Sequence, residues 1–364
     1  MLKKVITSIA LLLVLGAVVV GVASYVVSRP VGGDRLDPGR LERHEIADAE
    51  LALSFARTVG DDGVRLLVVN AWEAGEVTAA DITDAFAVMY RDPVDALASV
   101  GFEAVAAAAQ SSAKRSYAPE DLVMPLELNY PHIAAGTNFK AHAEEVGTDG
   151  EPFLFPKLAR PTPWFANVSV AARLDYEAEV CVVPLRYLSR TELATDELPG
   201  SLGYLLCNDY TDRYRLMSDI DLSEPMGLTG FAGGKGGESF LPVGPLLVVP
   251  REGWDFYREI RLFLWVNDEL RQRDTAGLMV WSPREILARA LAACETPYLH
   301  EGEEIRLSGC DGVAGRTLVL TGTPAGVAFH PINLWYPGFY LQSGDEVVTV
   351  GRYLGMLRNL VLDP

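Results

Sequence analysis

Two glutamates, Glu177 and Glu179, stand two positions apart beside the apolar run of residues 180–183. If this segment is a β-strand, side chains at positions i and i+2 project from the same face. Two ionised carboxylates so placed raise each other's pKa, unless a cation lies between them or water solvates both. The apolar run indicates a buried strand and weakens the option of solvation by open water. By itself, however, a Glu-x-Glu pattern is weak, and a solvated strand face is its ordinary interpretation.

A third carboxylate, Asp209, directly follows Asn208 at the end of another apolar run. The tip of a strand is a usual position for site residues. Glu177, Glu179 and Asp209 would give a metal ion an all-oxygen ligand set. Such a set suits Mg²⁺ or Mn²⁺ better than Zn²⁺, which favours histidine and cysteine.

The candidate acid–base pair is His142 and Glu145, within residues 136–146. If this stretch is helical, Glu145 at i+3 lies on the same face as His142, where it can orient the imidazole and raise its basicity. Such a dyad could activate a water molecule. A surface histidine beside acidic residues is the alternative.

Two glycine-rich turns are the remaining candidates for chemistry. Lys235 lies between two glycine pairs, which let the backbone approach a ligand closely, although the pattern is not that of a phosphate-binding loop. Residues 318–326 read as a strand that runs into a Gly/Pro turn. The hydroxyls and amides of that turn could hold a carboxylate or an oxyanion, with a plain turn as the alternative.

The elements that must position these residues are mostly short strands. Beyond about residue 125, apolar runs separated by Gly and Pro occur at residues 168–172, 179–183, 246–249, 262–266, 317–320 and 346–350. One helix is predicted from Ser282, because Ser-Pro-Arg-Glu supplies an N-cap, a proline at the first helical position and a capping-box glutamate. Residues 45–118 are rich in alanine and predict a mainly helical region with one strand at 65–69, while residues 31–44 read as a polar linker.

The first thirty residues differ from the remainder of the chain. Residues 5–28 carry no charge, and as a helix they would measure about 36 Å, enough to cross a bilayer with tilt. We therefore expect a single-pass N-terminal anchor, with a cleaved secretory signal as the alternative. Lys and Arg flank the segment on both sides, so the charge pattern leaves open whether the body is cytoplasmic or lies outside the membrane.

Charge and cysteine content limit the partners and the compartment. The chain of 364 residues has 31 Lys plus Arg against 49 Asp plus Glu, a net charge of −18, which argues against binding to nucleic acid. Cys181 and Cys207 lie in apolar runs and are expected to be free thiols, whereas Cys294 and Cys310 could pair in an oxidising compartment.

In their order along the chain, these segments resemble the fumarylacetoacetate hydrolase family. The matching motifs are residues 136–145, 155–157, 177–179, 203–213, Lys235 before 244–245, 266–272, 321–326 and 344–345. Each motif is short, and the order of all eight makes the resemblance specific. It covers about residues 125–360.

The resemblance implies an α+β, β-rich fold, in which mixed β-sheets form a roll or barrel over residues 125–364. Residues 1–30 would be the transmembrane anchor or signal, 31–44 the linker and 45–124 a small, mainly helical N-terminal region. It also implies that Glu177, Glu179 and Asp209 hold Mg²⁺ or Mn²⁺. The implied roles are base for His142, orienter for Glu145, electrophilic helper for Lys235, and substrate contacts for Arg213, Gln272 and Thr323, with Arg213 able to bind a substrate carboxylate bidentately.

The expected activity is hydrolysis of a C–C bond in an acylpyruvate-like acid, or in another 1,3-dicarbonyl or 2-oxo acid, through an enolate stabilised by the metal. Oxaloacetate-type decarboxylation and hydroxymuconate-type isomerisation are alternatives on the same scaffold, because fold does not fix the reaction. A membrane-tethered protein that binds metal and ligand without turnover is the alternative from another class. The expected partners are a small anionic acid, the membrane and a second copy of the chain in a homodimer.

Overall fold

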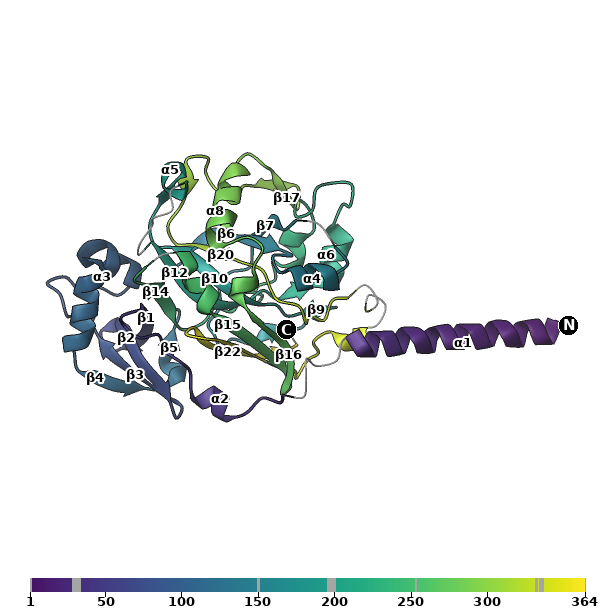
Figure 1. Cartoon of the computed structure of the whole chain (residues 1–364), viewed down its shortest axis with the longest axis horizontal. Coiled ribbons are helices and arrows are strands. Elements are labelled where there is room, and N and C mark those ends of the chain that lie inside the picture. The colour runs from purple at the N-terminus through teal and green to yellow at the C-terminus, as the bar shows by residue number, and fades with distance from the viewer. Residues whose placement is uncertain are drawn as a thin grey trace.

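The structure is a computed structural model that describes residues 2–27, 34–148, 151–194, 201–252, 254–330, 333 and 337–363. The end of the expected anchor (28–30) and the start of the expected linker (31–33) lie outside the described residues. Helix α1 (Leu2–Val27) projects from one end of the body as a single rod (Figure 1). Its segment Ile6–Ala23 is long and apolar enough to cross a membrane, and none of it is buried against the described residues.

Over the described residues, the largest sheet has eleven strands in the order β4-β3-β2-β1-β14-β12-β10-β20-β6-β7, with β5 paired to β1. Its strands are β1 (Ala52–Gly60), β2 (Gly63–Glu73), β3 (Glu76–Asp81), β4 (Lys114–Tyr117), β5 (Leu122–Val123), β6 (Asn129–Gly136), β7 (Phe153–Lys157), β10 (Ala178–Pro184), β12 (Leu202–Asn208), β14 (Leu247–Pro250) and β20 (Thr317–Leu320). Strands β20 and β6 run parallel while β10 runs antiparallel to both β12 and β20, so the sheet is mixed.

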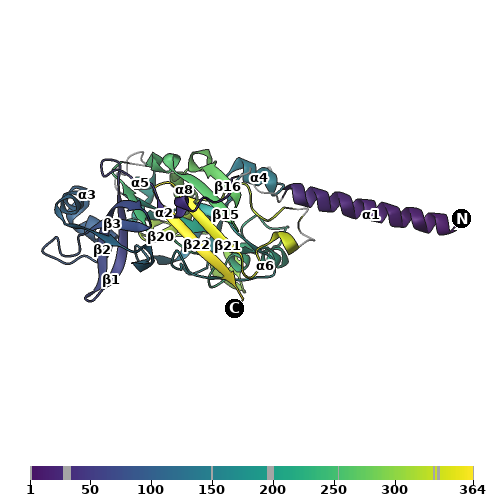
Figure 2. The same ribbon diagram turned by 90° about the horizontal axis from the view of Figure 1, so that it is seen from below.

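A second sheet of five described strands has the order β16-β15-β21-β22-β8. These strands are β8 (Val168–Ser169), β15 (Arg261–Val266), β16 (Glu269–Thr275), β21 (Glu346–Gly351) and β22 (Gly355–Leu362). Figure 2 shows β15, β21 and β22 side by side, with the C-terminus at the end of β22. The β-rich α+β fold expected for this part of the chain is therefore present.

Short ladders and helices complete the described structure. The ladders pair β9 (Leu174–Asp175) with β13 (Thr211–Asp212), β11 (Leu188–Ser189) with β19 (Gly312–Val313), and β17 (Tyr298–His300) with β18 (Glu303–Ile305). The helices of the body are α2 (Gly39–Glu42), α3 (Pro93–Ser111), α4 (Lys140–Glu145), α5 (Arg190–Leu193), α6 (Arg213–Asp219), α7 (Phe231–Gly234) and α8 (Pro283–Ala292). Ser282 and Glu285 form the expected capping box at the start of α8.

Strand β10 is buried on both faces, which explains its continuous apolar sequence. Val180 and Val182 belong to one hydrophobic core, whereas Cys181 and Val183 belong to the core on the opposite face. Because side chains alternate along a strand, Glu179 shares the face of Cys181. The expected buried strand is confirmed, and its carboxylate enters the interior.

The expectation of a mainly helical region over residues 45–124 is wrong. The structure has strands β1 to β5 there and one long helix, α3. Leu53 and Phe55 lie two apart in β1 and point into one core, as period-two alternation in a strand requires. Strand β1 pairs with β14, with Phe55 opposite Leu247, so these strands continue the sheet that carries β10 and β12. Pairing with a strand far along the chain overrides the local helical preference of the alanine-rich sequence.

The described part of the expected linker, residues 34–44, is packed onto the body. Leu36 donates its amide to the Asp268 carbonyl oxygen (2.9 Å), and Leu36 and Leu41 contact the small core around Trp265. His44 is buried and its ring contacts Trp72 edge to face at 4.6 Å. Residues 34–44 are therefore held against the body, with Leu36 bonded to the turn between β15 and β16.

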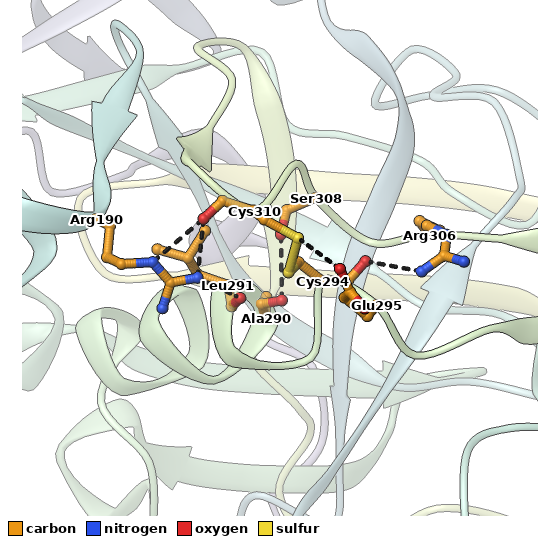
Figure 3. The surroundings of a disulfide bond; sticks show 8 residues. All are labelled: Arg190, Ala290, Leu291, Cys294, Glu295, Arg306, Ser308 and Cys310. Carbon is orange, nitrogen blue, oxygen red and sulfur yellow. Dashed lines mark hydrogen bonds between the residues drawn. A yellow bond between two sulfur atoms is a disulfide. The ribbon is translucent and has the colours of Figure 1, made fainter.

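Both possible disulfides are formed in the structure. Cys294 and Cys310 are bonded, as expected for an oxidising compartment, and tie the end of α8 to the loop before β19 (Figure 3). Arg190 donates two hydrogen bonds to the Cys310 carbonyl oxygen, at 2.8 and 3.2 Å. The expectation of free thiols at Cys181 and Cys207 is wrong, because these residues lie on adjacent antiparallel strands with their side chains on one face.

Candidate functional site

Strands β10 and β12 bring three carboxylates together at one end of their ladder. Ala178 pairs with Asn208, so Glu177 just before β10 meets Asp209 just after β12, and the Asp209 amide donates to the Glu177 carbonyl oxygen (2.9 Å). One side-chain oxygen from each of Glu177, Glu179 and Asp209 lies within 4.8 Å of the others. All three residues are buried. The register of two strands therefore assembles the oxygen cluster expected from the sequence.

Two lysines neutralise part of this cluster. The Lys235 ammonium lies 2.6 Å from Glu177 Oε2 and 2.9 Å from Asp209 Oδ2, and it also donates to the Thr211 hydroxyl. Lys157, which is fully buried, donates to Asp209 Oδ1 at 2.5 Å. No role was assigned to Lys157 from the sequence, although it lies in the short motif 155–157, which was part of the family resemblance.

The environment separates the acidities of the two glutamates. Burial raises the pKa of Glu177, but the positive charges of Lys235 and Arg213 outweigh it and hold that pKa below its usual range. Burial raises the pKa of Glu179 well above its usual range, and the Asp209 and Glu177 carboxylates raise it further. Among the described residues, Glu179 receives a hydrogen bond from the Gly322 amide (2.7 Å) and forms no ion pair. Glu179 is thus the carboxylate that most lacks a cation.

Arg213 is held by two carboxylates. Its Nε donates to Asp175 Oδ2 at 2.9 Å, and its Nη2 donates to Glu177 Oε1. Asp175 is itself fixed by the amides of Ala328 (2.7 Å) and Phe329 (3.0 Å). Arg213 lines the cavity, and these two ion pairs use its Nε and one Nη2 hydrogen, so the expected bidentate contact with a substrate carboxylate would have to use Nη1 and the second Nη2 hydrogen. Asp175 was missed from the sequence, since its partner lies 38 positions away.

The predicted helix around His142 is confirmed as α4, and His142 Nδ1 lies 3.2 Å from Glu145 Oε2. The Glu145 carboxylate also accepts the Gly326 amide, at 2.9 and 3.1 Å. Gly326 has φ +108°, and a Cβ there would lie 2.0 Å from the Arg271 carbonyl oxygen, so only glycine fits. The turn after β20 thereby fixes the carboxylate that orients the histidine.

Gln272 acts on the same turn rather than on the cavity. It is fully buried, accepts the Ala178 amide (2.9 Å), and donates to the Thr323 hydroxyl (2.8 Å) and the Pro324 carbonyl oxygen (2.7 Å). The expected substrate contact of Gln272 is replaced by a structural one, because its amide is engaged inside the wall. Thr323 does line the cavity, and its hydroxyl donates to the Ala178 carbonyl oxygen (3.0 Å).

A cavity of about 200 Å³ joins these groups. It is lined by six polar residues from the cluster and its surroundings: His142, Glu177, Glu179, Arg213, Lys235 and Thr323. Asp209 lies beneath Lys235, and Glu145 lies behind His142. Thr137 also lines the cavity, and its buried hydroxyl has no hydrogen-bond partner among the described residues. Thr137 is a polar group that sequence reasoning missed.

The three clustered carboxylates fit a hard divalent cation. Every donor is an oxygen, the oxygens lie within reach of one ion, and Glu179 lacks a positive partner. Lys157, Lys235 and Arg213 face the four carboxylates of Asp175, Glu177, Glu179 and Asp209, and Glu179 is the one of these four without an ion pair among the described residues.

The fold and the site together define a class of β-rich enzymes with a carboxylate cluster beside a His–Glu pair. Residues 131–362 match the family model described as the C-terminal domain of fumarylacetoacetate (FAA) hydrolase. The chain belongs to the fumarylacetoacetate hydrolase family.

Relatives within the family have different reactions in their names. A 2,4-didehydro-3-deoxy-L-rhamnonate hydrolase of Sphingomonas sp. (strain SKA58) is 27% identical over 63% of this chain and 72% of its own length. A mitochondrial oxaloacetate tautomerase of Oryza sativa subsp. japonica is 28% identical over 58% of this chain and 84% of its own. Members thus include hydrolases and tautomerases.

A solved structure shares the fold beyond the region that the family model matches. The fumarylacetoacetate hydrolase of psychrophilic Exiguobacterium antarcticum has a TM-score of 0.59 at 21% identity, over 86% of this chain and 100% of that chain. This likeness reaches into the N-terminal strands, in agreement with their place in the large sheet.

Proposed function

We propose that this chain is an enzyme that uses a divalent metal ion to hydrolyse a C–C bond in a 2-oxo or 1,3-dicarbonyl acid of the acylpyruvate type. The observation that carries the proposal is the shared cavity: His142, oriented by Glu145, opens onto the space that Glu177 and Glu179 line. A protein that only bound its ligand would have no need of a water-activating pair beside the carboxylate cluster.

Glu177, Glu179 and Asp209 would hold Mg²⁺ or Mn²⁺. When bound, such an ion supplies Lewis-acid stabilisation of negative charge on the substrate oxygens. Lys157 and Lys235 hold the carboxylates of Glu177 and Asp209 in place through hydrogen bonds. These two lysines therefore preserve the geometry that the ion requires.

His142 would act as the general base. Its Nδ1 is engaged with Glu145, which leaves Nε2 to accept a proton from water. Glu145 then stabilises the imidazolium, while the Gly326 amide keeps the carboxylate in place. The Lys235 ammonium, on the cavity wall, would stabilise the negative charge that develops on the leaving enolate oxygen.

A test uses the full chain in detergent, stripped of metal and then loaded with Mn²⁺, with acetylpyruvate, fumarylpyruvate and oxaloacetate as substrates. We expect hydrolysis of an acylpyruvate, with a loss of about 100-fold or more in kcat for both His142→Ala and Glu177→Ala. Glu144→Gln, on the same helix but exposed, is the matched control and should retain activity.

The other outcomes separate the alternatives. Turnover of oxaloacetate that survives His142→Ala but not Glu177→Ala would indicate decarboxylation, because that reaction needs the metal but no activated water. The rice relative is named an oxaloacetate tautomerase, which makes reactions of oxaloacetate the second candidate. Tight binding of the acids without turnover would mean that the chain is a binding protein and would refute the enzymatic proposal.

We also propose that α1 anchors the protein in a membrane as a single span. The segment Ile6–Ala23 is apolar and unburied, as a span facing lipid must be. In fractionated cells, the full chain is expected in the membrane fraction, and extraction should require detergent rather than high salt. Recovery of a soluble chain that begins after about residue 24 would show that the segment is a cleaved signal instead.

A further inference from the structure

The cavity has two unlike parts. Its base carries the ionised groups Glu177, Arg213 and Lys235. The remaining lining is mostly apolar. It includes Phe153, Phe155, Phe231 and Phe329, and a wall of six aliphatic side chains from α6 and from the segments that follow α4 and α6: Val146, Leu216, Met217, Ile220, Leu222 and Met226. A ligand that fills this cavity must therefore be polar at one end and apolar at the other.

Three of the wall residues also form the rim of the cavity. Met217, Leu222 and Met226 line the cavity and are 39%, 77% and 44% exposed. Large apolar side chains gathered at an opening are costly in water, and a ligand that covers them gains the corresponding hydrophobic free energy. Methionine and leucine side chains can also adapt to a flexible hydrocarbon chain.

The charges around the rim exclude a second acidic group on the ligand. Among the described residues that line the cavity, Arg213 and Lys235 are the only permanent cations, and both are bound to carboxylates at the base. Residues 216–226 carry Asp219, Asp221 and Glu224, of which Asp219 is paired with Arg215 (3.6 Å). A carboxylate at the far end of a substrate would meet negative charge and no free cation.

We propose that the substrate's acyl arm is an unbranched hydrocarbon chain of about six carbons or more, which lies along residues 216–226 while the 2-oxo acid head reaches the base. This inference rests on the proposed function and gives it a substrate class: amphiphilic acylpyruvates rather than acids with a second carboxylate. Helix α6, which supplies Leu216 and Met217, and helix α4, which precedes Val146, lie at the end of the body from which α1 projects (Figures 1 and 2).

The test is a chain-length series of straight acylpyruvates, from acetylpyruvate to decanoylpyruvate, with fumarylpyruvate as the dicarboxylate. The full chain is loaded with Mn²⁺ and kept in one detergent at one concentration. Each methylene that enters the apolar part should raise kcat/KM about fourfold until the wall is filled. A flat series, or a preference for fumarylpyruvate, would overturn the inference and leave the hydrolase proposal intact.

Variants locate the effect on the rim. Leu222→Gln and Met226→Gln should each lower the ratio of kcat/KM for decanoylpyruvate to that for acetylpyruvate by about tenfold. Leu278→Gln is the matched control, because Leu278 is 59% exposed and lies away from the cavity lining. An unchanged ratio in both rim variants would refute the placement of the arm.

A binding arm keeps the two proposals separate. If no acylpyruvate is hydrolysed, titration of the Mn²⁺-loaded chain with 2-oxobutanoate and 2-oxodecanoate still measures how much the apolar wall contributes to binding affinity. Tighter binding of 2-oxodecanoate that Leu222→Gln abolishes would support the inference while the hydrolase proposal fails. Equal affinity for both acids would refute the inference independently of any turnover.

Discussion

At the scale of single residues, the most consequential group is one that the sequence did not identify as functional. Lys157 is fully buried, and Asp209 lies between its ammonium and that of Lys235. Burial lowers the pKa of Lys157, although the Asp209 carboxylate opposes this effect. The Phe240 carbonyl oxygen accepts a further hydrogen bond from the Lys157 ammonium (2.9 Å). Lys157 is therefore committed to holding Asp209 rather than to meeting substrate.

Replacing this lysine should destabilise the protein in a way that metal reverses. Lys157→Met leaves Asp209 with one cation, and loss of one partner from a buried ion pair costs about 3–5 kcal/mol. Added Mn²⁺ should raise the melting temperature of the variant more than that of the wild type, because the ion replaces the missing charge. Thermal unfolding with and without Mn²⁺ measures both effects.

Lys140→Met is the control for this comparison, since Lys140 is exposed and its only described ion pair, with Glu144, is at the surface. It should unfold like the wild type under both conditions. An equal Mn²⁺ effect on Lys157→Met and the wild type would contradict the assigned role.

At the scale of elements, the turn after β20 links the carboxylate cluster to α4, the helix that carries His142. Gly322 donates to Glu179 and Gly326 to Glu145, while Gln272 from β16 holds Thr323 and Pro324 against β10. Asn138, just before α4, adds a hydrogen bond to the Thr321 carbonyl oxygen (2.8 Å). The buried side-chain amide of Gln272 on β16 thus holds the turn that contacts both the carboxylate cluster and the His142–Glu145 pair.

Gln272→Leu should therefore lower both stability and turnover. The substitution leaves the Ala178 amide and the Pro324 carbonyl without their partner inside the core, at a cost of about 1–3 kcal/mol for each unsatisfied group. We expect a lower kcat with little change in KM, because the turn that orients Glu145 shifts while the rim is intact. The exposed Gln110→Leu is the matched control, and a normal kcat in Gln272→Leu would show that the turn holds its position without this amide.

The contact of the buried His44 ring with Trp72 of β2 should make stability depend on pH. Burial lowers the pKa of His44 to about 4. Below about pH 6.5 the unfolded chain binds a proton at this position that the native chain refuses, so stability falls as the pH drops towards 4. The full loss is about 3 kcal/mol.

His44→Phe keeps an aromatic contact with Trp72 and removes the titration. The difference in unfolding free energy between variant and wild type should be constant above pH 6.5 and shift in favour of the variant between pH 6.5 and 4. Chemical denaturation at several pH values measures this difference. Parallel stability curves over the whole range would contradict the assignment to His44.

At the scale of the whole molecule, an apolar N-terminal helix and two disulfides occur in one chain. Disulfides persist in oxidising compartments. If α1 spans a membrane, as proposed above, the two disulfides favour a body on its outer side, a choice that the Lys and Arg pattern of the sequence leaves open. A pocket for amphiphilic acids near the anchored end would then take ligands that partition into that membrane.

The Cys294–Cys310 bond should be present in protein isolated from its own membrane. Alkylation of denatured, unreduced protein is expected to modify none of the four cysteines. Loss of this bond in a Cys294→Ala, Cys310→Ala double variant should cost about 3 kcal/mol, because it closes a loop over 16 positions. Mass spectrometry counts the thiols, and full alkylation of all four would place the body in a reducing compartment.

The sequence alone determined what depends on short stretches of chain. Period-two alternation predicts that Glu177 and Glu179 share a face, helical spacing predicts the His142–Glu145 pair, and Ser282 with its capping box predicts α8. The order of the motifs was enough to indicate the family, because each motif is local and the chain keeps them in sequence.

Only the tertiary structure decided which distant groups meet. Three contacts join positions that lie 38 to 94 residues apart: Lys157 with Asp209, Arg213 with Asp175, and Gln272 with Ala178. The alanine-rich N-terminal region became strands because β1 pairs with β14, a contact that no local preference encodes. Spacing along the chain sets the geometry within one element, whereas the burial of charge and the choice of strand partner depend on long-range packing.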